Sequence, residues 1–176
     1  LNPFEFFPHE SITSRVDMIK ASIEASFDME AAIPQIIETA IYKCYEDLGW
    51  NISTNENEKF ENPFDDGVYA FPTLENLVNK IEKVVDIQGF DARLRNDYIG
   101  SIKARLQGLL IGSKGLMLNT KRSVDFKKII TKKVILEIEE IKSGSEKSLI
   151  MGFVLINLIE AIKANHKENR SFKHIT

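Results

Sequence analysis

The chain has 176 residues, of which 43% are apolar and 28% are charged, so it can bury one substantial core. Its net charge of -3 argues against a protein whose whole surface binds a polyanion, because neutralising phosphates requires clustered Lys and Arg. The single cysteine, Cys44, cannot form an internal disulfide, which favours a reducing cytoplasm. The longest apolar run, 149–159, is shorter than the roughly 20 residues of a membrane-spanning helix, so we expect no membrane segment.

Helical periodicity dominates the first two thirds of the chain. Apolar residues at spacings of three and four predict helices over residues 14–28, 34–48, 73–88 and 92–110. Gly49 is expected to end the second helix in a left-handed conformation, with Trp50 packing back as a structural residue. The polar, acidic stretch 51–71 lacks helical periodicity and is predicted to be a solvated loop, and it also lacks the ligand spacing of a calcium site.

The last third of the chain has a different pattern. Ser123 is expected to cap a short helix, and the β-branched run 134–138 is apolar nearly throughout, as in a parallel strand covered on both faces. A capping box beginning at Ser143 then starts a long apolar helix over about residues 145–165. The segment 172–176 suggests another strand, so that strand, crossover helix and strand would form a βαβ unit.

These elements predict a predominantly helical α/β fragment, in which a helical insertion is joined to a partial parallel sheet. Residues 13–111 would form the insertion and residues 112–176 the sheet-bearing part, with residues 1–12 as a lead-in segment. Both ends look cut, since no Met precedes Leu1 and a strand begins where the chain stops. We therefore expect the interior of a larger protein.

No catalytic, cofactor-binding or metal-ligating set can be assigned. Two glycines precede Lys114, but three residues separate them where a phosphate-binding loop has four, and no hydroxyl residue follows the lysine. A turn at the end of a helix is the better interpretation. The histidines share no ligand-like spacing with Cys44 or with the carboxylates; they are His9, His166 and His174.

One cluster of charge stands above the background. Seven basic residues fall within residues 114–133, where Asp125 is the only acidic residue. Phosphate-backbone contact needs such clustering, so the candidate nucleic-acid contacts are Lys121, Arg122, Lys127 and Lys128. The alternative is a solvated rim around a short helix.

Several short motifs occur together in a particular order: LNPF at 1–4, YEDLGW at 45–50, FPTL at 71–74, Arg105 and Leu106 before Gly112 and Gly115, the run 134–138, and the segment 147–156. In this order and spacing the chain resembles the central portion of a HerA-type ATPase of the HerA/FtsK superfamily, between the Walker A and Walker B motifs. The resemblance spans nearly the whole chain.

The resemblance implies a parent with a P-loop, RecA-like motor domain, assembled as a hexameric ring that uses ATP and magnesium to move double-stranded DNA, often beside a nuclease. This chain holds neither Walker motif, so we expect it not to hydrolyse ATP alone. Asn2, Pro3 and Phe4 are the candidate segment near the nucleotide, and a plain structural turn is the alternative for them.

A second class of function is also open from the sequence. The chain can instead be a stand-alone helical protein-interaction or regulatory module without enzymatic activity. In either case, an uncovered flank of the apolar helix around 149–159 could make the isolated chain a dimer.

Overall fold

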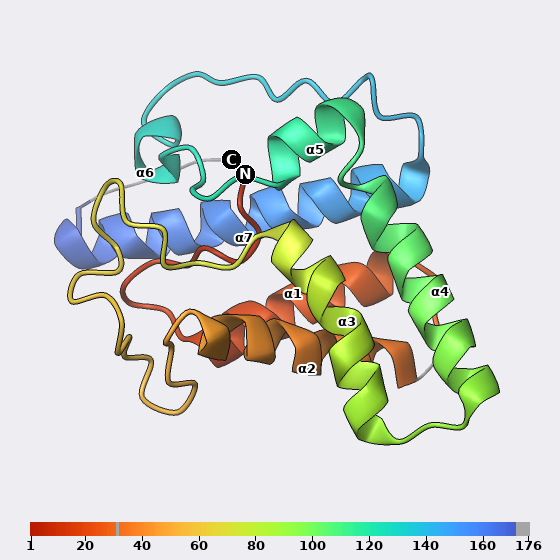
Figure 1. Cartoon of the computed structure of the whole chain (residues 1–176). Helices are drawn as coiled ribbons and strands as arrows, with labels where there is room; N and C mark the ends of the chain where they lie inside the picture. Colours follow the sequence, from red (N-terminus) through yellow and green to blue (C-terminus); the bar gives the residue numbers. More distant parts are fainter. Residues whose placement is uncertain (31, 172–176) are drawn as a thin grey trace.

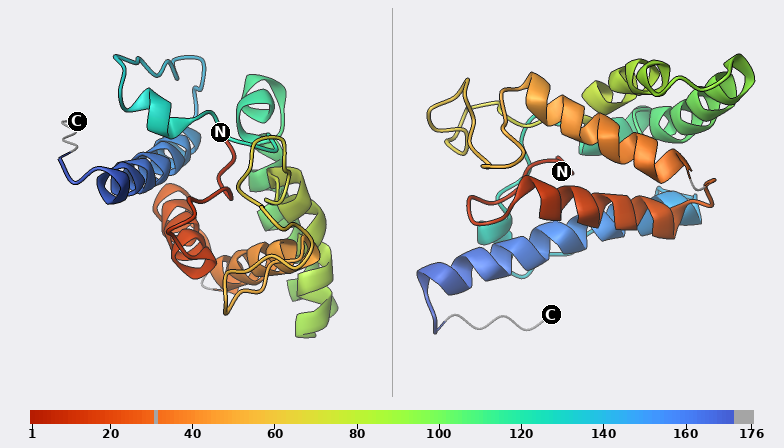
Figure 2. Two further views of the ribbon diagram at one scale, coloured as in Figure 1. Left: turned by 90° about the vertical axis from the view of Figure 1, so that its left-hand side faces the viewer. Right: turned by 90° about the horizontal axis from the view of Figure 1, so that it is seen from below.

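The computed structural model describes residues 1–30 and 32–171, and within them it contains seven α-helices (Figure 1). The helices are α1 (Ile12–Ser26), α2 (Ala32–Asp47), α3 (Leu74–Gln88), α4 (Ala92–Gly108), α5 (Gly112–Leu118), α6 (Phe126–Ile129) and α7 (Gly144–Glu168). α7 lies along α1, α1 along α2, α2 along α3 and α3 along α4, so each long helix packs against the next (Figures 1 and 2). The short helices α5 and α6 lie near α7.

The four predicted helices of the first two thirds are confirmed, with shifts at their ends. Ser11, not Ser14, caps α1: its hydroxyl accepts a hydrogen bond from the Ser14 amide. At the end of α2, Gly49 has a φ of 87°, which favours glycine. The amide of Trp50 donates to the carbonyl of Tyr45, and that of Gly49 to Glu46, which is the expected Schellman ending.

The long apolar helix is also confirmed, and Ser143 caps it as predicted, but the Glu146 side chain binds Lys114 instead of completing the predicted capping box. Ser143 accepts from the amide of Glu146, and the helix continues to Glu168. The short helix α6 begins at Phe126, but its cap is Asp125, whose carboxylate accepts from the amide of Lys128. Ser123 was predicted to fill this role, and it bonds the N-terminal segment instead.

The predicted partial parallel sheet is wrong. Within residues 1–30 and 32–171 there is no strand, and the described backbone outside the helices forms a single isolated bridge, between Trp50 and Asn57. The run 134–138 is an unpaired loop, because a strand needs a neighbour that exchanges backbone hydrogen bonds with it. The second predicted strand, 172–176, lies outside the described residues. Helices α1 and α6 pack against α7 on the sides where the predicted sheet would have lain.

One large core joins both halves of the chain. It contains buried side chains of α1, α2, α3, α4 and α7 together with Phe4 and Phe6 from the N-terminal segment. The stretch 51–71 was predicted to be a solvated loop, yet Phe64 and Phe71 pack their rings against Phe6 and Trp50. The acidic residues of this stretch suggest full solvation, but Phe64 and Phe71 hold the loop against the core.

Candidate functional site

The Asn2, Pro3 and Phe4 segment is buried and forms the centre of a hydrogen-bond network. The Asn2 side-chain amide donates to the carbonyls of Pro72 and Lys121, and its oxygen accepts from the amide of Phe4. Its backbone amide donates to the Ser123 hydroxyl at 2.8 Å. These contacts match the structural interpretation of the segment, because every polar group of the Asn2 side chain is occupied within the protein.

Glu5 and Arg122 form the polar side of the same region. The Nε of Arg122 lies 2.7 Å from a Glu5 carboxylate oxygen, and the other oxygen accepts from the amide of Ser123. The remaining guanidinium nitrogens donate to backbone carbonyls of the 51–71 loop, those of Phe64, Asp65 and Val68. The Arg122 side chain, only 24% exposed, therefore ties this loop to the N-terminal segment.

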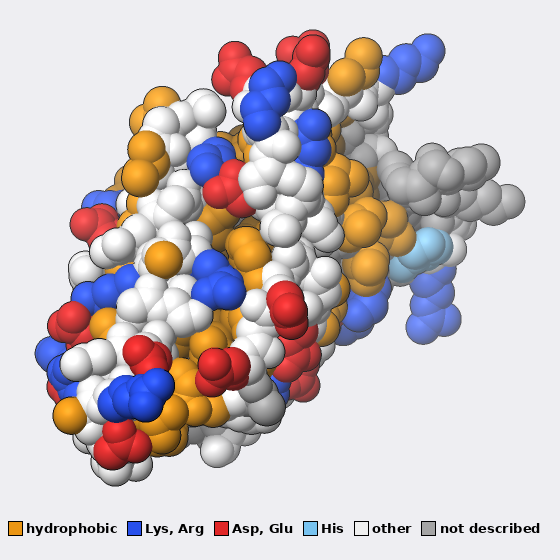
Figure 3. Space-filling model, turned by 90° about the vertical axis from the view of Figure 1, so that its right-hand side faces the viewer, with side chains coloured by type: hydrophobic (Ala, Val, Ile, Leu, Met, Phe, Trp, Pro, Cys, Tyr) orange, Lys and Arg blue, Asp and Glu red, His pale blue; other side chains and the backbone are white. Residues whose placement is uncertain are grey.

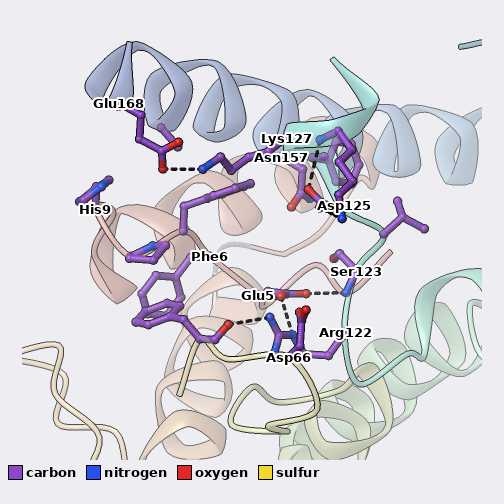
Figure 4. A pocket seen from close by; sticks show the side chains of 17 residues that line it. Glu5, Phe6, His9, Asp66, Arg122, Ser123, Asp125, Lys127, Asn157 and Glu168 are labelled. Atoms are coloured by element: carbon purple, nitrogen blue, oxygen red, sulfur yellow. Dashed lines mark hydrogen bonds and ion pairs between the residues drawn. The ribbon is translucent and has the colours of Figure 1, made fainter. Parts of the chain in front are cut away.

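A cavity of about 360 Å³ opens between this segment, α6 and the end of α7 (Figure 4). Figure 4 shows Glu5 between Arg122 and Ser123 on one side of it, and the ion pair between Lys127 and Glu168 on another. Apolar rings line the rest of the wall, among them those of Phe6, Phe7, Phe64 and Phe126. Three ion pairs neutralise most of the charge that lines the cavity, namely Arg122–Glu5, Lys127–Glu168 and Lys128–Asp125, and Asp66 also lines it.

The four candidate nucleic-acid contacts differ in how available they are. Arg122 is engaged as described, and Lys127 is paired with Glu168. Lys128 lies 3.0 Å from Asp125 but its side chain remains 77% exposed. Lys121 lies over the ring of Tyr69, 4.7 Å from its centre. Only Lys121 and Lys128 thus keep ammonium groups that can reach a phosphate in solution.

Charges of both signs are interspersed on the surface shown in Figure 3, with hydrophobic side chains between them. Lys114, which the sequence placed in the basic cluster, is bound to Glu146 on α7 at 2.6 Å. Paired in this way, Lys114 adds little to any local positive field.

A buried ion pair that was not predicted from the sequence crosses the core. The guanidinium of Arg15 on α1 lies 3.1 Å from Glu160 on α7, and both side chains are fully buried. Asn157 accepts a second hydrogen bond from Arg15, and the amide of Phe7 donates to the other Glu160 oxygen. Burial raises the pKa of Glu160, and the charge of Arg15 opposes this shift without cancelling it. A lone Glu and Asn inside an apolar helix were the signal that could have located this pair.

The apolar face of α7 is only partly covered. Met151, Leu155 and Ile159 follow one another at four-residue spacing and are exposed, whereas Ile150 and Phe153 point into the core. We call the three exposed residues the α7 stripe. By length and composition α7 could cross a membrane, although a core helix meets the same criterion, and its Glu160 is paired inside the protein. No group of three His, Cys, Asp or Glu side chains could hold a metal ion among the described residues.

Comparison with known proteins gives no relative. No model of a protein family matches the chain, and no curated protein and no solved structure matches it either.

Proposed function

We propose that this chain is a helical docking segment of a HerA-type ATPase, and that it supplies contact surface to the motor rather than the groups that hydrolyse ATP. The observation that carries the proposal is the α7 stripe, three large apolar side chains exposed in a row on the longest helix. Contiguous exposed apolar side chains mark surfaces that another protein can cover. The sequence resemblance supplies the identity of that protein, namely the rest of the motor.

ATP chemistry is assigned to the parent. The glycines at 112 and 115 belong to α5, and Lys114 between them is bound to Glu146. That lysine is therefore engaged elsewhere than on a phosphate. ATP and magnesium are cofactors of the parent, and a hexameric ring, double-stranded DNA and a partner nuclease are its proposed partners. A cytoplasmic location belongs to the same proposal.

The test compares the isolated chain with the product of the full reading frame. The isolated chain should neither bind nor hydrolyse ATP, whereas the full product should hydrolyse it. Leu155→Lys in the full product should lower hydrolysis by preventing docking, and in the isolated chain it should leave the circular dichroism spectrum unchanged because Leu155 is exposed. Tight ATP binding by the isolated chain, or a full product without ATPase activity, contradicts the proposal.

Duplex DNA binding is the second arm of the test. We expect weak binding by the isolated chain that falls steeply with salt, since backbone contacts release counterions. Lys121→Ala with Lys128→Ala should reduce the logarithmic salt slope by about one for each lysine. The control is Lys43→Ala with Lys83→Ala, on α2 and α3, which removes the same charge from another surface. If both pairs of substitutions reduce the salt slope equally, the basic cluster has no special role in DNA binding.

The second candidate is a self-contained helical interaction or regulatory module. A single extensive core favours it: among the residues that the structure describes, thirty-one buried hydrophobic residues form one cluster. The two candidates share the α7 stripe as the contact surface, and they differ in the partner. A reading frame that encodes a glycine-rich loop with Lys-Ser or Lys-Thr upstream selects the motor, and one that encodes no such loop selects the module.

A further inference from the structure

The loop between α6 and α7 leaves a row of backbone groups without partners. The amide groups of residues 133–137 find no acceptor, and their carbonyls no donor, within the described part of the chain. Every residue from 131 to 137 is exposed to solvent. A row of free amides and carbonyls is what a sheet edge offers to another strand, and the β-branched side chains here favour that conformation.

The side chains of this loop differ in exposure with a period of two. Val134 and Leu136 are 55% and 46% exposed, and Ile138 packs against the large core. Ile135, between them, is 88% exposed. A strand has this alternation, because successive side chains point to opposite faces. One face of such a strand would carry Val134 and Leu136 toward the body, and the other would carry Ile135 outward.

The charges that flank the apolar run fit a second copy of the same run. Lys133 precedes it and Glu137 follows it, each two residues from Ile135. When two copies pair antiparallel about Ile135, each Lys133 lies opposite the Glu137 of the other copy, and Ile135 lies opposite itself. On the other face Val134 lies opposite Leu136. Parallel pairing in register would instead place Lys opposite Lys and Glu opposite Glu, which is unfavourable.

We propose that residues 132–138 of two copies of this chain pair as antiparallel strands centred on Ile135, and that this pairing makes the protein a dimer. The loop arches along the rim of the molecule, and none of the described helices lies outside it (Figures 1 and 2). A second copy therefore reaches it without displacing a packed element. Two strands of seven residues are a small interface, so the dimer forms at high protein concentration and dissociates on dilution.

This inference does not rest on the proposed ATPase parent, and its test uses the chain alone. Sedimentation velocity over a dilution series should show a monomer–dimer equilibrium. Lys133→Glu and Glu137→Lys should each weaken the dimer at least tenfold, because like charges then face each other. The double variant Lys133→Glu/Glu137→Lys should restore it, since the pairs re-form with exchanged signs. A wild-type chain that stays monomeric at all concentrations overturns the proposal, as do single variants that dimerise normally.

A crosslinking experiment fixes the register. Ile135→Cys should give a disulfide-linked dimer under mild oxidation, because the two residues face each other across the dimer axis. Val134→Cys is the matched control, since it faces Leu136 and not itself. Cys44 is buried and should give no background. If Leu155→Lys abolishes the dimer while Lys133→Glu leaves it intact, the two copies meet through the α7 stripe and the proposed pairing is wrong.

Discussion

Arg15 connects more separate segments than any neighbouring side chain of α1. Its guanidinium bonds Glu160 and Asn157 on α7 and the carbonyl of Glu5 in the N-terminal segment. Its Nε has no hydrogen-bond partner in the described structure. Burying two charges costs solvation, so this pair fixes the positions of α1, α7 and the N-terminal segment relative to one another while adding little net stability.

The interaction energy between Arg15 and Glu160 can be measured with a double-mutant cycle. Glu160→Leu should lower the free energy of unfolding by about 3–5 kcal/mol, because it leaves Arg15 charged and buried without its partner. Arg15→Met combined with Glu160→Leu should cost less than Glu160→Leu alone, since no buried charge remains. Urea unfolding of the variants gives these values. A double variant whose loss equals the sum of the two single losses would show that the residues do not interact.

Ionisation of Cys44 should lower the stability of the folded protein at alkaline pH. Burial raises the pKa of its thiol from the ordinary 9.0 to about 12. The pKa of the thiol is higher in the folded than in the unfolded chain. The stability that the neutral, buried thiol contributes is therefore complete below about pH 9 and is lost as the pH rises toward 12. Urea unfolding across this range should show a decline that is smaller in Cys44→Ala. An equal decline in both proteins would assign it to other groups, such as the buried Tyr45.

Some residue roles could be read from the sequence and others could not. Trp50 as a structural residue after Gly49 followed from the chain itself, because a Schellman ending is a local pattern. The contacts of Asn2 with Lys121 and Ser123 join residues about 120 positions apart. No local pattern encodes them, so the basic cluster was predicted without knowing that Arg122 is held by Glu5.

At the scale of elements, helix ends were predictable to within a few residues, and α5 was not predicted at all. Helix caps and helix-ending glycines are recognised within one turn of sequence. The helix ends at Thr73, Ser143 and Gly89 could therefore be predicted from the local sequence. The run 134–138 has the composition of a strand, but strand formation depends on a partner that composition cannot reveal. The sheet prediction failed for this reason.

The turn from α4 into α5 depends on a close approach of the backbone. A Cβ atom added at Gly115 would lie 2.1 Å from the carbonyl oxygen of Leu110, and that backbone atom cannot move aside cheaply. Gly115→Ala should therefore lower the free energy of unfolding by about 1–3 kcal/mol. Gly100→Ala is the control: it lies inside α4 with nothing within 4 Å, and should raise stability by roughly 0.5–1 kcal/mol. Thermal melts of the two variants should shift in opposite directions, and a neutral Gly115→Ala would contradict the packing described.

The whole molecule should unfold as one unit. The sequence predicted a division after residue 111, but α1 and α7, on either side of it, pack together and share one core. Trp50 reports on the first part by fluorescence, and far-ultraviolet circular dichroism reports on all helices. We expect the two urea transitions to coincide. Separate transitions, with the circular dichroism signal lost in two steps, would show that the two parts fold independently.

The buried position of residues 2–7 has a consequence for how the protein is made. A ribosome delivers these residues long before Lys121 and Ser123, which bond Asn2, and before Glu160, which bonds the amide of Phe7. Phe6 can pack against Trp50, Phe64 and Phe71 before then, but the hydrogen bonds of Asn2 and of the Phe7 amide are still missing, so the segment is only partly held. The native contacts of residues 2–7 are thus complete only once α7 has been made, and we expect a chain that stops before Glu160 to aggregate more readily than the full one.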